Sequence, residues 1–450
     1  MKRDQCRYLF DIILMMLITK TTIAVILGGT GGHVFQEKAI KDPFLVHFSR
    51  ADTQAVHEVI FAISQPNMET LVHVLEDVSD PSSLNYGKHW SKSQVADLTA
   101  NKEGYNALMN YLHSKPDVII GRQTLFGEYI FAKAPIHVWE DVFATTFHIY
   151  EVFIDGSRKE ALKQIIRAEE YSLPVELEGH VSTVLNTVQF HGANAVQNEY
   201  IRDSKNGPIA AVSAQKESSE QSLLSSKESF LAQTPTRQPT ATMQPTGLYA
   251  IGSVTPRFIN QYYNVSSNTG NLQVSQAVYE TNYEGYSPSD LKMFQKSFGL
   301  PLQAPNEHGS FFNYHNCTYR DCKHGNFMLQ YIMGIAQNVK TIYDYELPDN
   351  NDFLSNWITS VSNTATPANV YSISWGIDEL YVSPSFANLF NTEAIKLGVM
   401  GTTILTSSGN DGALPSKAQG NPSYCGYVPT FPSSSPYVVV VGGTNVSKNL

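Results

Sequence analysis

The order of strands and helices along this chain predicts an α+β domain followed by an α/β domain. Between residues 56 and 154 the segments run strand, helix, strand, strand, helix, strand, which is the order of a ferredoxin-like sandwich. After residue 250, strand-like segments alternate with helices, a pattern typical of a parallel sheet covered by helices on both faces. Residues 203–246 are rich in Ser, Gln, Thr, Lys and Pro and are too poor in apolar residues to form a core. We therefore predict a first domain over residues 45–190, an exposed linker with a processing site over 203–246, and a second domain over 250–450.

Composition restricts the classes of function. The chain has 450 residues, which is enough for two or three domains with sizeable cores. A hydrophobic share of 42% is that of a globular protein. The 31 Lys and Arg residues against 41 Asp and Glu give a net charge of −10, and no basic run is interleaved with aromatic residues. This balance argues against nucleic acid as a partner.

The N-terminus has the features of a targeting segment. Basic residues precede the apolar run LFDIILMMLI, and small residues follow it, so residues 1–28 are predicted to be a signal peptide. A single membrane anchor is the alternative. Asp11 and Lys20 interrupt the apolar stretch, however, so we expect no membrane span and favour secretion. Three N-glycosylation sequons agree with secretion: Asn264, Asn316 and Asn445.

The four cysteines give a weak metal signal and one disulfide candidate. Cys6 lies in the predicted signal peptide, which leaves three cysteines in the mature chain. Cys317 and Cys322 are close enough to pair in a small loop. Their C-x₄-C spacing lacks a second ligand pair, so we expect no metal site.

Hydrophobic periodicity places the elements of the first domain. Residues 56–65 (VHEVIFAISQ) are predicted to be a strand. A turn then leads to a helix that continues to Asp77, with Asn67 as its N-cap. The other predicted elements are a helix around residues 105–112, strands at 118–120 and 128–131, a helix at 135–143 and a strand at 148–154.

Caps, stops and apolar runs place the elements of the second domain. Thr255 opens a short helix, and a second helix begins at Ser287 or Ser289 and ends at Gly299. A third helix over residues 326–337 is apolar nearly all round, so we expect it to be buried. The remaining predicted elements are strands at 371–374, 401–407 and 438–441 and a helix with apolar residues from Phe386 to Leu397 that ends at Gly398.

Seven short motifs occur in the order found in one peptidase family. The most specific is DVSDPSSLNYGKHWSKSQVADL at residues 77–98. The others are VTPRFINQYYNV (254–265), SQAVYETNYEGYSPSDLKMFQKSFGLP (275–301), LQYIMGIAQ (329–337), VYSISWGIDE (370–379), SSGNDGA (407–413) and FPSSSPYVVVVGGT (431–444). Together they resemble the sedolisin family of serine-carboxyl peptidases, which includes tripeptidyl peptidases. The resemblance implies a pro-domain followed by a subtilisin-like α/β peptidase domain whose C-terminal part is missing.

The resemblance also implies a chemistry and its partners. The family hydrolyses peptide bonds with a Ser nucleophile, a Glu base and an Asp that orients the Glu, the two carboxylates lying one turn apart on one helix face. A carboxylate base suits acidic surroundings, where histidine is protonated. The expected partners are a peptide or protein substrate and the chain's own pro-domain, packed against the peptidase domain. The expected location is secreted or a lysosome-like acidic compartment.

The family's catalytic residues do not carry over to this chain. Alignment of the motifs places His324 at the family Glu position and Met328 at the family Asp position. The further Asp that lines the oxyanion hole corresponds to Asn410, in the loop SSGNDGA. The Gly-Thr-Ser turn with the nucleophile has no counterpart before Leu450, so the nucleophilic Ser is absent. The family's calcium site lies in the same missing part, so we expect no cofactor in this chain.

Two hypotheses follow from this departure. In the first, the chain is a sedolisin-type proenzyme homologue that is inactive as written. In the second, it is a non-catalytic relative that acts as a binding or inhibitory module toward an active paralogue. Met328 is expected to pack in the core, since Met has no acid–base role. His324 is either a partly exposed histidine at the start of a helix or the base of a Ser–His pair.

Overall fold

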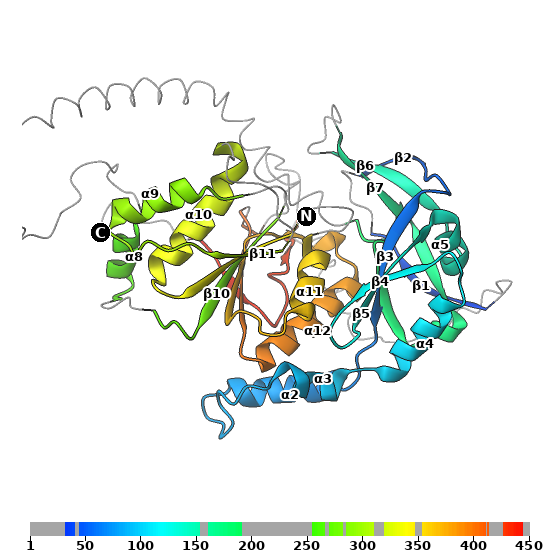
Figure 1. The fold of residues 1–450 in the computed structure, drawn as a ribbon, viewed down its shortest axis with the longest axis horizontal. Coiled ribbons are helices and arrows are strands. Elements are labelled where there is room, and N and C mark those ends of the chain that lie inside the picture. The colour runs from blue at the N-terminus through cyan, green and yellow to red at the C-terminus, as the bar shows by residue number, and fades with distance from the viewer. Residues whose placement is uncertain are drawn as a thin grey trace, which may run out of the picture.

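The computed structural model contains two packed parts, each built around its own sheet (Figure 1). The structure describes residues 32–40, 45–153, 161–190, 254–265, 270–281, 285–309, 319–346, 353–410, 412–413 and 426–443. The predicted signal peptide and the predicted linker lie outside these residues. No helix in the described ranges is both long and apolar enough to cross a membrane.

The first part is built on a four-stranded antiparallel sheet. Its strand order is β4 (Ile119–Gln123), β5 (Tyr129–Pro135), β3 (Val56–Ile63) and β9 (Val181–Leu185). Helices α4 (Lys102–His113) and α5 (Ile136–Phe143) share a buried core with this sheet. The predicted α+β fold class is confirmed.

The strand predicted at residues 148–154 forms, but in another sheet. It is β6 (Phe147–Phe153), which pairs with β2 (Leu45–Arg50) and β7 (Ala161–Ala168) in a separate three-stranded sheet. The fourth place beside β3 is taken by β9, about thirty residues further along the chain. A small two-stranded sheet of β1 (His33–Lys38) and β8 (Glu170–Pro174) completes this part.

Two helices extend from the first part toward the second. Helix α2 (Met68–Ser79) begins where predicted, but the role of Asn67 differs. Asn67 is left-handed (φ 59°) and its side chain makes no cap; its Nδ2 instead donates to the Leu98 carbonyl at 2.8 Å. Helix α3 (Lys92–Thr99) was not predicted, although Ser91 and Gln94 form a capping box at its start.

The second part is built on a six-stranded sheet in which every neighbouring pair is parallel. The prediction of a parallel α/β sheet is therefore confirmed. The strand order is β11 (Asn306–Gly309), β12 (Lys340–Tyr345), β10 (Ser275–Glu280), β13 (Val370–Ile373), β15 (Thr403–Ser407) and β17 (Val439–Val441). Strands β14 (Ile377–Asp378) and β16 (Thr430–Phe431) form a separate, short antiparallel pair.

Helix ends in this part follow the predicted chemistry. Thr255 caps α8 (Pro256–Tyr262), its hydroxyl accepting from the Phe258 N–H. Ser287, rather than Ser289, caps α9 (Pro288–Phe298). Gly299 ends α9 with φ 66°, a left-handed conformation that glycine adopts without strain.

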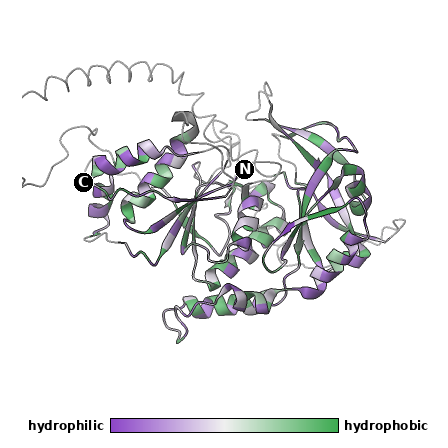
Figure 2. Ribbon diagram, in the orientation of Figure 1, coloured by the Kyte–Doolittle hydropathy of each residue, from purple (hydrophilic) through white to green (hydrophobic). Residues whose placement is uncertain are grey.

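Helix α10 (Tyr319–Ile335) begins about two turns earlier than predicted and buries only one stripe. The positions buried at helical spacing are Cys322, Gly325, Leu329 and Met333, whereas Phe327 is 55% exposed. The prediction that this helix is buried all round is therefore wrong. Figure 2 shows hydrophilic and hydrophobic residues along the same helices, as expected where one face packs on a sheet.

The two faces of the parallel sheet are covered by different helices. Residues of α9 and α10 pack with Tyr343 and Tyr345 of β12 in one apolar cluster. On the other face lie α11 (Phe353–Asn363) and α12 (Pro384–Val399), between the two sheets of the molecule (Figure 1). Because side chains alternate along a strand, successive residues of each strand point in turn to the two layers of helices.

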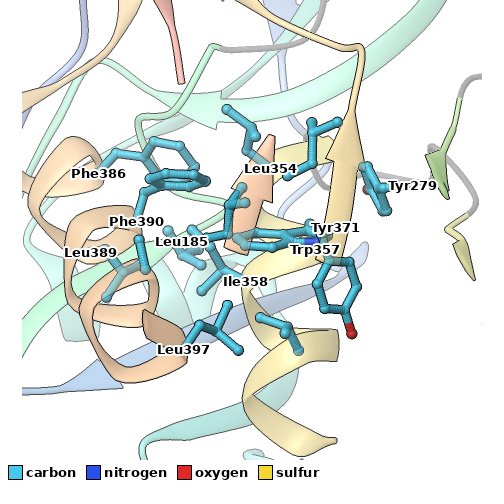
Figure 3. Close-up of a cluster of buried hydrophobic side chains, with 14 of the residues drawn as sticks. Leu185, Tyr279, Leu354, Trp357, Ile358, Tyr371, Phe386, Leu389, Phe390 and Leu397 are labelled. Atoms are coloured by element: carbon cyan, nitrogen blue, oxygen red, sulfur yellow. The ribbon is translucent and has the colours of Figure 1, made fainter. Parts of the chain in front are cut away.

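A single hydrophobic core joins the two parts. Leu185 of β9 lies among Trp357 and Ile358 of α11 and Phe390 of α12 (Figure 3). Other members from the first part are Ile60, Ala62, Tyr129 and Phe131, and all are at most 2% exposed. The face of the first sheet opposite α4 and α5 is thus buried by helices of the second part.

Candidate active site

One edge of the parallel sheet gathers the polar residues that the motifs single out. Glu280 is the last residue of β10, and Ser374 and Trp375 directly follow β13. Tyr279 pairs with Ile373, so Glu280 and Ser374 are the next residues along two neighbouring strands. Carboxyl ends of parallel strands meet at one edge, where ligands of such sheets bind.

One turn of α10 lies across these two strand ends. His324 Nδ1 is 3.0 Å from Glu280 Oε2, and Met328, four residues later, contacts Ser374. Residues four apart lie on the same face of a helix, which lets the pair contact adjacent strands. The two positions that the family resemblance assigns to carboxylates therefore face β10 and β13.

The environment of His324 is built by Glu280 and Trp375. The His324 side chain is 18% exposed and that of Glu280 is 0% exposed. Trp375 Nε1 donates to the same Glu280 oxygen at 3.0 Å, and its ring centroid is 5.3 Å from that of His324. A carboxyl group that no sequence argument identified thus contacts the histidine directly.

Glu280 escaped the sequence analysis because its partner lies 44 residues away along the chain. Its signal was present in the motif SQAVYETNYEGY, where a glutamate directly follows the apolar run AVY. Glutamate is almost never fully buried without a partner, so a glutamate in a buried strand predicts a polar or charged partner. Without the fold, nothing in the sequence indicated that the partner is on α10.

Met328 packs beside the site without joining the main core. Its side chain is half-buried, and the Ser374 hydroxyl donates to its Sδ at 3.3 Å. A thioether is a weak acceptor and cannot exchange protons, so Met328 cannot replace an orienting carboxylate. The orienting contact to residue 324 comes from β10 and not from the helix itself.

The other predicted site residues are only partly described. Asn410 is exposed just after β15 and follows Gly409, whose φ of 81° turns the chain there. Asn264 is exposed at the end of α8, while Asn316 and Asn445 lie outside the described residues. Cys322 is disulfide-bonded; since Cys317 is not among the described residues, their pairing stays a prediction.

A second histidine–carboxyl pair lies on the outer strands of the same sheet. His308 Nδ1 of β11 is 2.8 Å from Asp344 Oδ1 of β12. The hydrogen bond to Asp344 raises the pKa of His308 above its ordinary value. The His308 side chain is 51% exposed, in contrast to His324, although its partner Asp344 is buried.

Buried charges tie the first part to α12. Lys396 Nζ is 3.2 Å from Glu128 Oε1 of the first part and 3.1 Å from Glu393 Oε1, and each of the three side chains is at most 4% exposed. Burial alone lowers the pKa of Lys396, but the charges of Glu393 and Glu128 outweigh it and raise that pKa. The Tyr129 hydroxyl donates to Glu393 at 3.0 Å, which completes a network across the interface.

The most specific sequence motif, residues 77–98, also lies at this interface. Trp90 N–H donates to the Val399 carbonyl at the end of α12. Gly401, with φ 87°, leaves room for the His89 ring, which is 2.7 Å from where a Cβ would stand. Lys92 Nζ donates to the Thr364 carbonyl at 2.7 Å. The motif therefore positions the first part on the second.

These features are the ones expected of a pro-domain packed against an α/β peptidase domain. Comparison with protein families agrees, since residues 45–190 match the pro-kumamolisin activation domain. The chain is 27% identical over 424 residues to tripeptidyl-peptidase 1 of Macaca fascicularis and of Homo sapiens. It is 26% identical over 482 residues to tripeptidyl-peptidase SED1 of Arthroderma otae. These sequence matches support assignment of the chain to the sedolisin family, with the family's pro-domain at residues 45–190.

The match covers most of this chain but less of its relatives. For both tripeptidyl-peptidase 1 sequences the alignment covers 90% of this chain and 64% of the relative; for SED1 the shares are 93% and 69%. Pseudomonas sedolisin, a serine-carboxyl proteinase complexed with pseudo-iodotyrostatin, is similar at a TM-score of 0.34 and 22% identity. That similarity covers 42% of this chain and 53% of the sedolisin chain, so the family assignment rests on the sequence matches.

Proposed function

We propose that this chain is the precursor part of a serine-type peptidase that hydrolyses peptide bonds. The observation that carries the proposal is the shared core of the two parts, in which β3, β5 and β9 cover helices α11 and α12. A pro-domain over residues 45–190 would keep the peptidase domain folded and covered until the segment 203–246 is cut. The relatives' names, tripeptidyl-peptidase 1 and tripeptidyl-peptidase SED1, support peptides as the substrate class. The mode of cleavage is either tripeptidyl-peptidase action or the endopeptidase action that the family resemblance also allows.

The same proposal includes a location and partners. A signal peptide over residues 1–28 and the sequons at Asn264, Asn316 and Asn445 support passage through the secretory route. The destination is the exterior or a lysosome-like compartment. The partners are a peptide or protein substrate and the chain's own pro-domain.

A non-catalytic role is the second candidate, and the observation in its favour is Met328. In place of an orienting carboxylate the helix presents a thioether, which accepts a hydrogen bond from Ser374. A relative that has lost catalysis could still use its pro-domain to cover the cleft of an active paralogue. The two candidates differ in one measurable property, which is hydrolysis by the pure protein.

The test is peptide cleavage by the purified full-length gene product. After the linker is cut, the protein is incubated with unstructured peptides that have free or blocked N-termini, at acid and at neutral pH. A serine-reactive fluorophosphonate probe reports a nucleophile independently of substrate choice. We expect cleavage and labelling; a folded, processed protein that does neither would establish the non-catalytic role.

A further inference from the structure

We propose that His324 is the general base of this peptidase and that Glu280 is the residue that positions it. The pair would replace the family's two helix carboxylates with an imidazole on α10 and a carboxyl group on β10. The inference rests on the proposed function, because a general base needs a reaction to serve. It adds a residue, Glu280, that the family resemblance does not supply.

The hydrogen bonds fix which ring nitrogen of His324 carries the proton. Trp375 Nε1 can only donate a hydrogen bond, so Glu280 Oε2 accepts from it. The same oxygen also contacts His324. With Glu280 in its carboxylate form, which only accepts, His324 Nδ1, 3.0 Å from that oxygen, is the donor. This assignment leaves the lone pair of the neutral ring on Nε2, the nitrogen that a base uses.

Burial makes the pair more than a surface contact. Glu280 is 0% exposed, and its Oε1 has no hydrogen-bond partner among the described residues. A buried carboxyl group held by two donors on one oxygen keeps its partner in one orientation, whereas exposed ion pairs exchange freely with water. A serine hydrolase needs a nucleophile, a base and a residue that orients the base. In subtilisin the orienting acid precedes the histidine along the chain, as Glu280 precedes His324 here.

The reaction step balances with His324, Glu280 and a serine hydroxyl, which the family resemblance supplies. The hydroxyl of the family's serine attacks the peptide carbonyl carbon while His324 Nε2 takes its proton, forming the C–O bond and moving the carbonyl electron pair onto oxygen. When the carbonyl re-forms, the C–N bond breaks and Nε2 returns the proton to the leaving amine. Water then repeats the sequence on the acyl-enzyme and releases the acid. Glu280 stays hydrogen-bonded to Nδ1 and stabilises the transient imidazolium.

The groups around His324 set the direction of its pH dependence. Glu280 on β10 is a titratable group in contact with His324, and Trp375 beyond β13 is uncharged. On the helix, Lys323 is exposed, and the Tyr343 hydroxyl of β12 lies next to Gly325. An imidazole base works only when deprotonated, so activity should fall on acidification, opposite to the expectation for a carboxylate base.

The first experiment detects the pair without requiring turnover. Proton NMR of the full chain should show a far-downfield imidazole N–H resonance from the His324–Glu280 hydrogen bond. We expect it to be absent in His324→Ala and Glu280→Gln and retained in His308→Ala, the control for the other histidine–carboxyl pair. A resonance that survives Glu280→Gln would overturn the positioning role.

The second experiment uses the full-length gene product and separates kcat from KM. We expect Glu280→Gln to lower kcat by about 10³–10⁴-fold and His324→Ala by at least as much, with KM nearly unchanged. His308→Ala should keep wild-type kcat, and urea midpoints identify any variant that fails to fold. Cleavage that persists in folded His324→Ala would overturn this inference but leave the proposed function standing. An inactive wild-type protein would instead overturn the proposed function and the base role with it.

Discussion

At the scale of single residues, the identity of residue 324 decides which residue pairs with it. A glutamate at this position would be paired within the helix, four residues along, and the resemblance predicts that pairing. The histidine is paired across to β10, where Glu280 accepts from Nδ1 at 3.0 Å. Met328 cannot orient residue 324, but Glu280 contacts it instead, so residue 324 still has an orienting partner.

His57 gives a prediction about acid stability. It is 1% exposed, its Nε2 contacts the Asn186 carbonyl, and its Nδ1 has no partner among the residues described. Burial lowers the pKa of His57 from 6.5 to about 4. Because the folded state binds this proton less readily, the stability from His57 is complete above pH 6.5 and is lost as pH falls toward 4. The gap corresponds to about 3 kcal/mol.

The measurement is the urea midpoint of the full chain at about pH 7 and about pH 4. His57→Gln should lose less stability than wild type between these two conditions, because glutamine does not titrate. His113→Gln, an exposed histidine on α4, is the control and should follow wild type. Equal losses in all three proteins would show that His57 does not set the acid sensitivity.

Lys396 gives a prediction about the interface. Lys396→Met leaves Glu128 and Glu393 buried without their cation. Removing one partner of a buried ion pair typically costs about 3–5 kcal/mol, and we expect a drop of that size in the free energy of unfolding at neutral pH. Lys292→Met on the exposed face of α9 is the control, with an expected change within about 0.5 kcal/mol. A similar midpoint for both variants would contradict the prediction.

Sequence reasoning found one partner of the site but not the other, and the reason is physical. His324 was identified because motifs fix its register along one helix. Glu280 contributes through the fold, since only the parallel pairing of β10 and β13 places its side chain beneath α10. Contacts between neighbouring strands and a covering helix depend on sheet order, which short motifs do not encode.

At the scale of elements, the start of α10 controls the site. Gly325, next to His324, is buried; a Cβ there would stand 2.2 Å from the Gly285 carbonyl oxygen and 2.7 Å from the Tyr343 hydroxyl. The first of these atoms is backbone and cannot move aside easily. The close approach of α10 to the chain at Gly285 therefore requires glycine.

Gly325→Ala should destabilise the protein even though alanine favours helices. Helix propensity alone would add up to about 1 kcal/mol of stability, but the clash with backbone should cost about 1–3 kcal/mol and displace the helix start. The urea midpoint should fall, and the downfield resonance of His324 should shift. Gly443→Ala, where nothing lies within 4 Å of the added Cβ, is the matched control. An increase in stability for Gly325→Ala would contradict this account of α10.

The caps and stops of α8 and α9 were predicted, although the capping box of α3 was overlooked, and several elements defined by pairing were missed. Thr255, Ser287 and Gly299 mark helix ends through local hydrogen bonds or a left-handed turn, so the local sequence is sufficient to predict these ends. Strand β9 was missed, because its place beside β3 depends on a partner more than a hundred residues earlier. Strands β10 and β12 and helix α11 were also missed; their apolar residues face covering layers that sequence alone does not reveal.

At the scale of the whole molecule, the first and second parts share one core rather than a surface contact. Side chains such as Leu185 and Phe131 are at most 2% exposed only because α11 and α12 cover them. Exposing this apolar area would cost roughly 25 cal/mol for each Å². Cutting the chain between the two parts should therefore not separate them.

A protease site inserted within residues 203–246 tests this expectation. After complete cleavage at neutral pH, the two fragments should elute together in size exclusion and separate only in denaturant. Repeating the experiment with Lys396→Met, which breaks the buried charge network, should weaken the association. Separation of the wild-type fragments without denaturant would show that the interface is weaker than its buried core implies.

The central claim, that an imidazole held by a buried carboxyl group replaces the family's carboxylate base, is tested most directly by the pH dependence of kcat/KM for the processed wild-type protein. A histidine base predicts activity that is greatest at neutral pH and falls steadily as the solution is acidified, because protonated His324 cannot accept the nucleophile's proton. Activity that instead rises toward acid pH, as a carboxylate base allows, would contradict the assignment of His324 and Glu280.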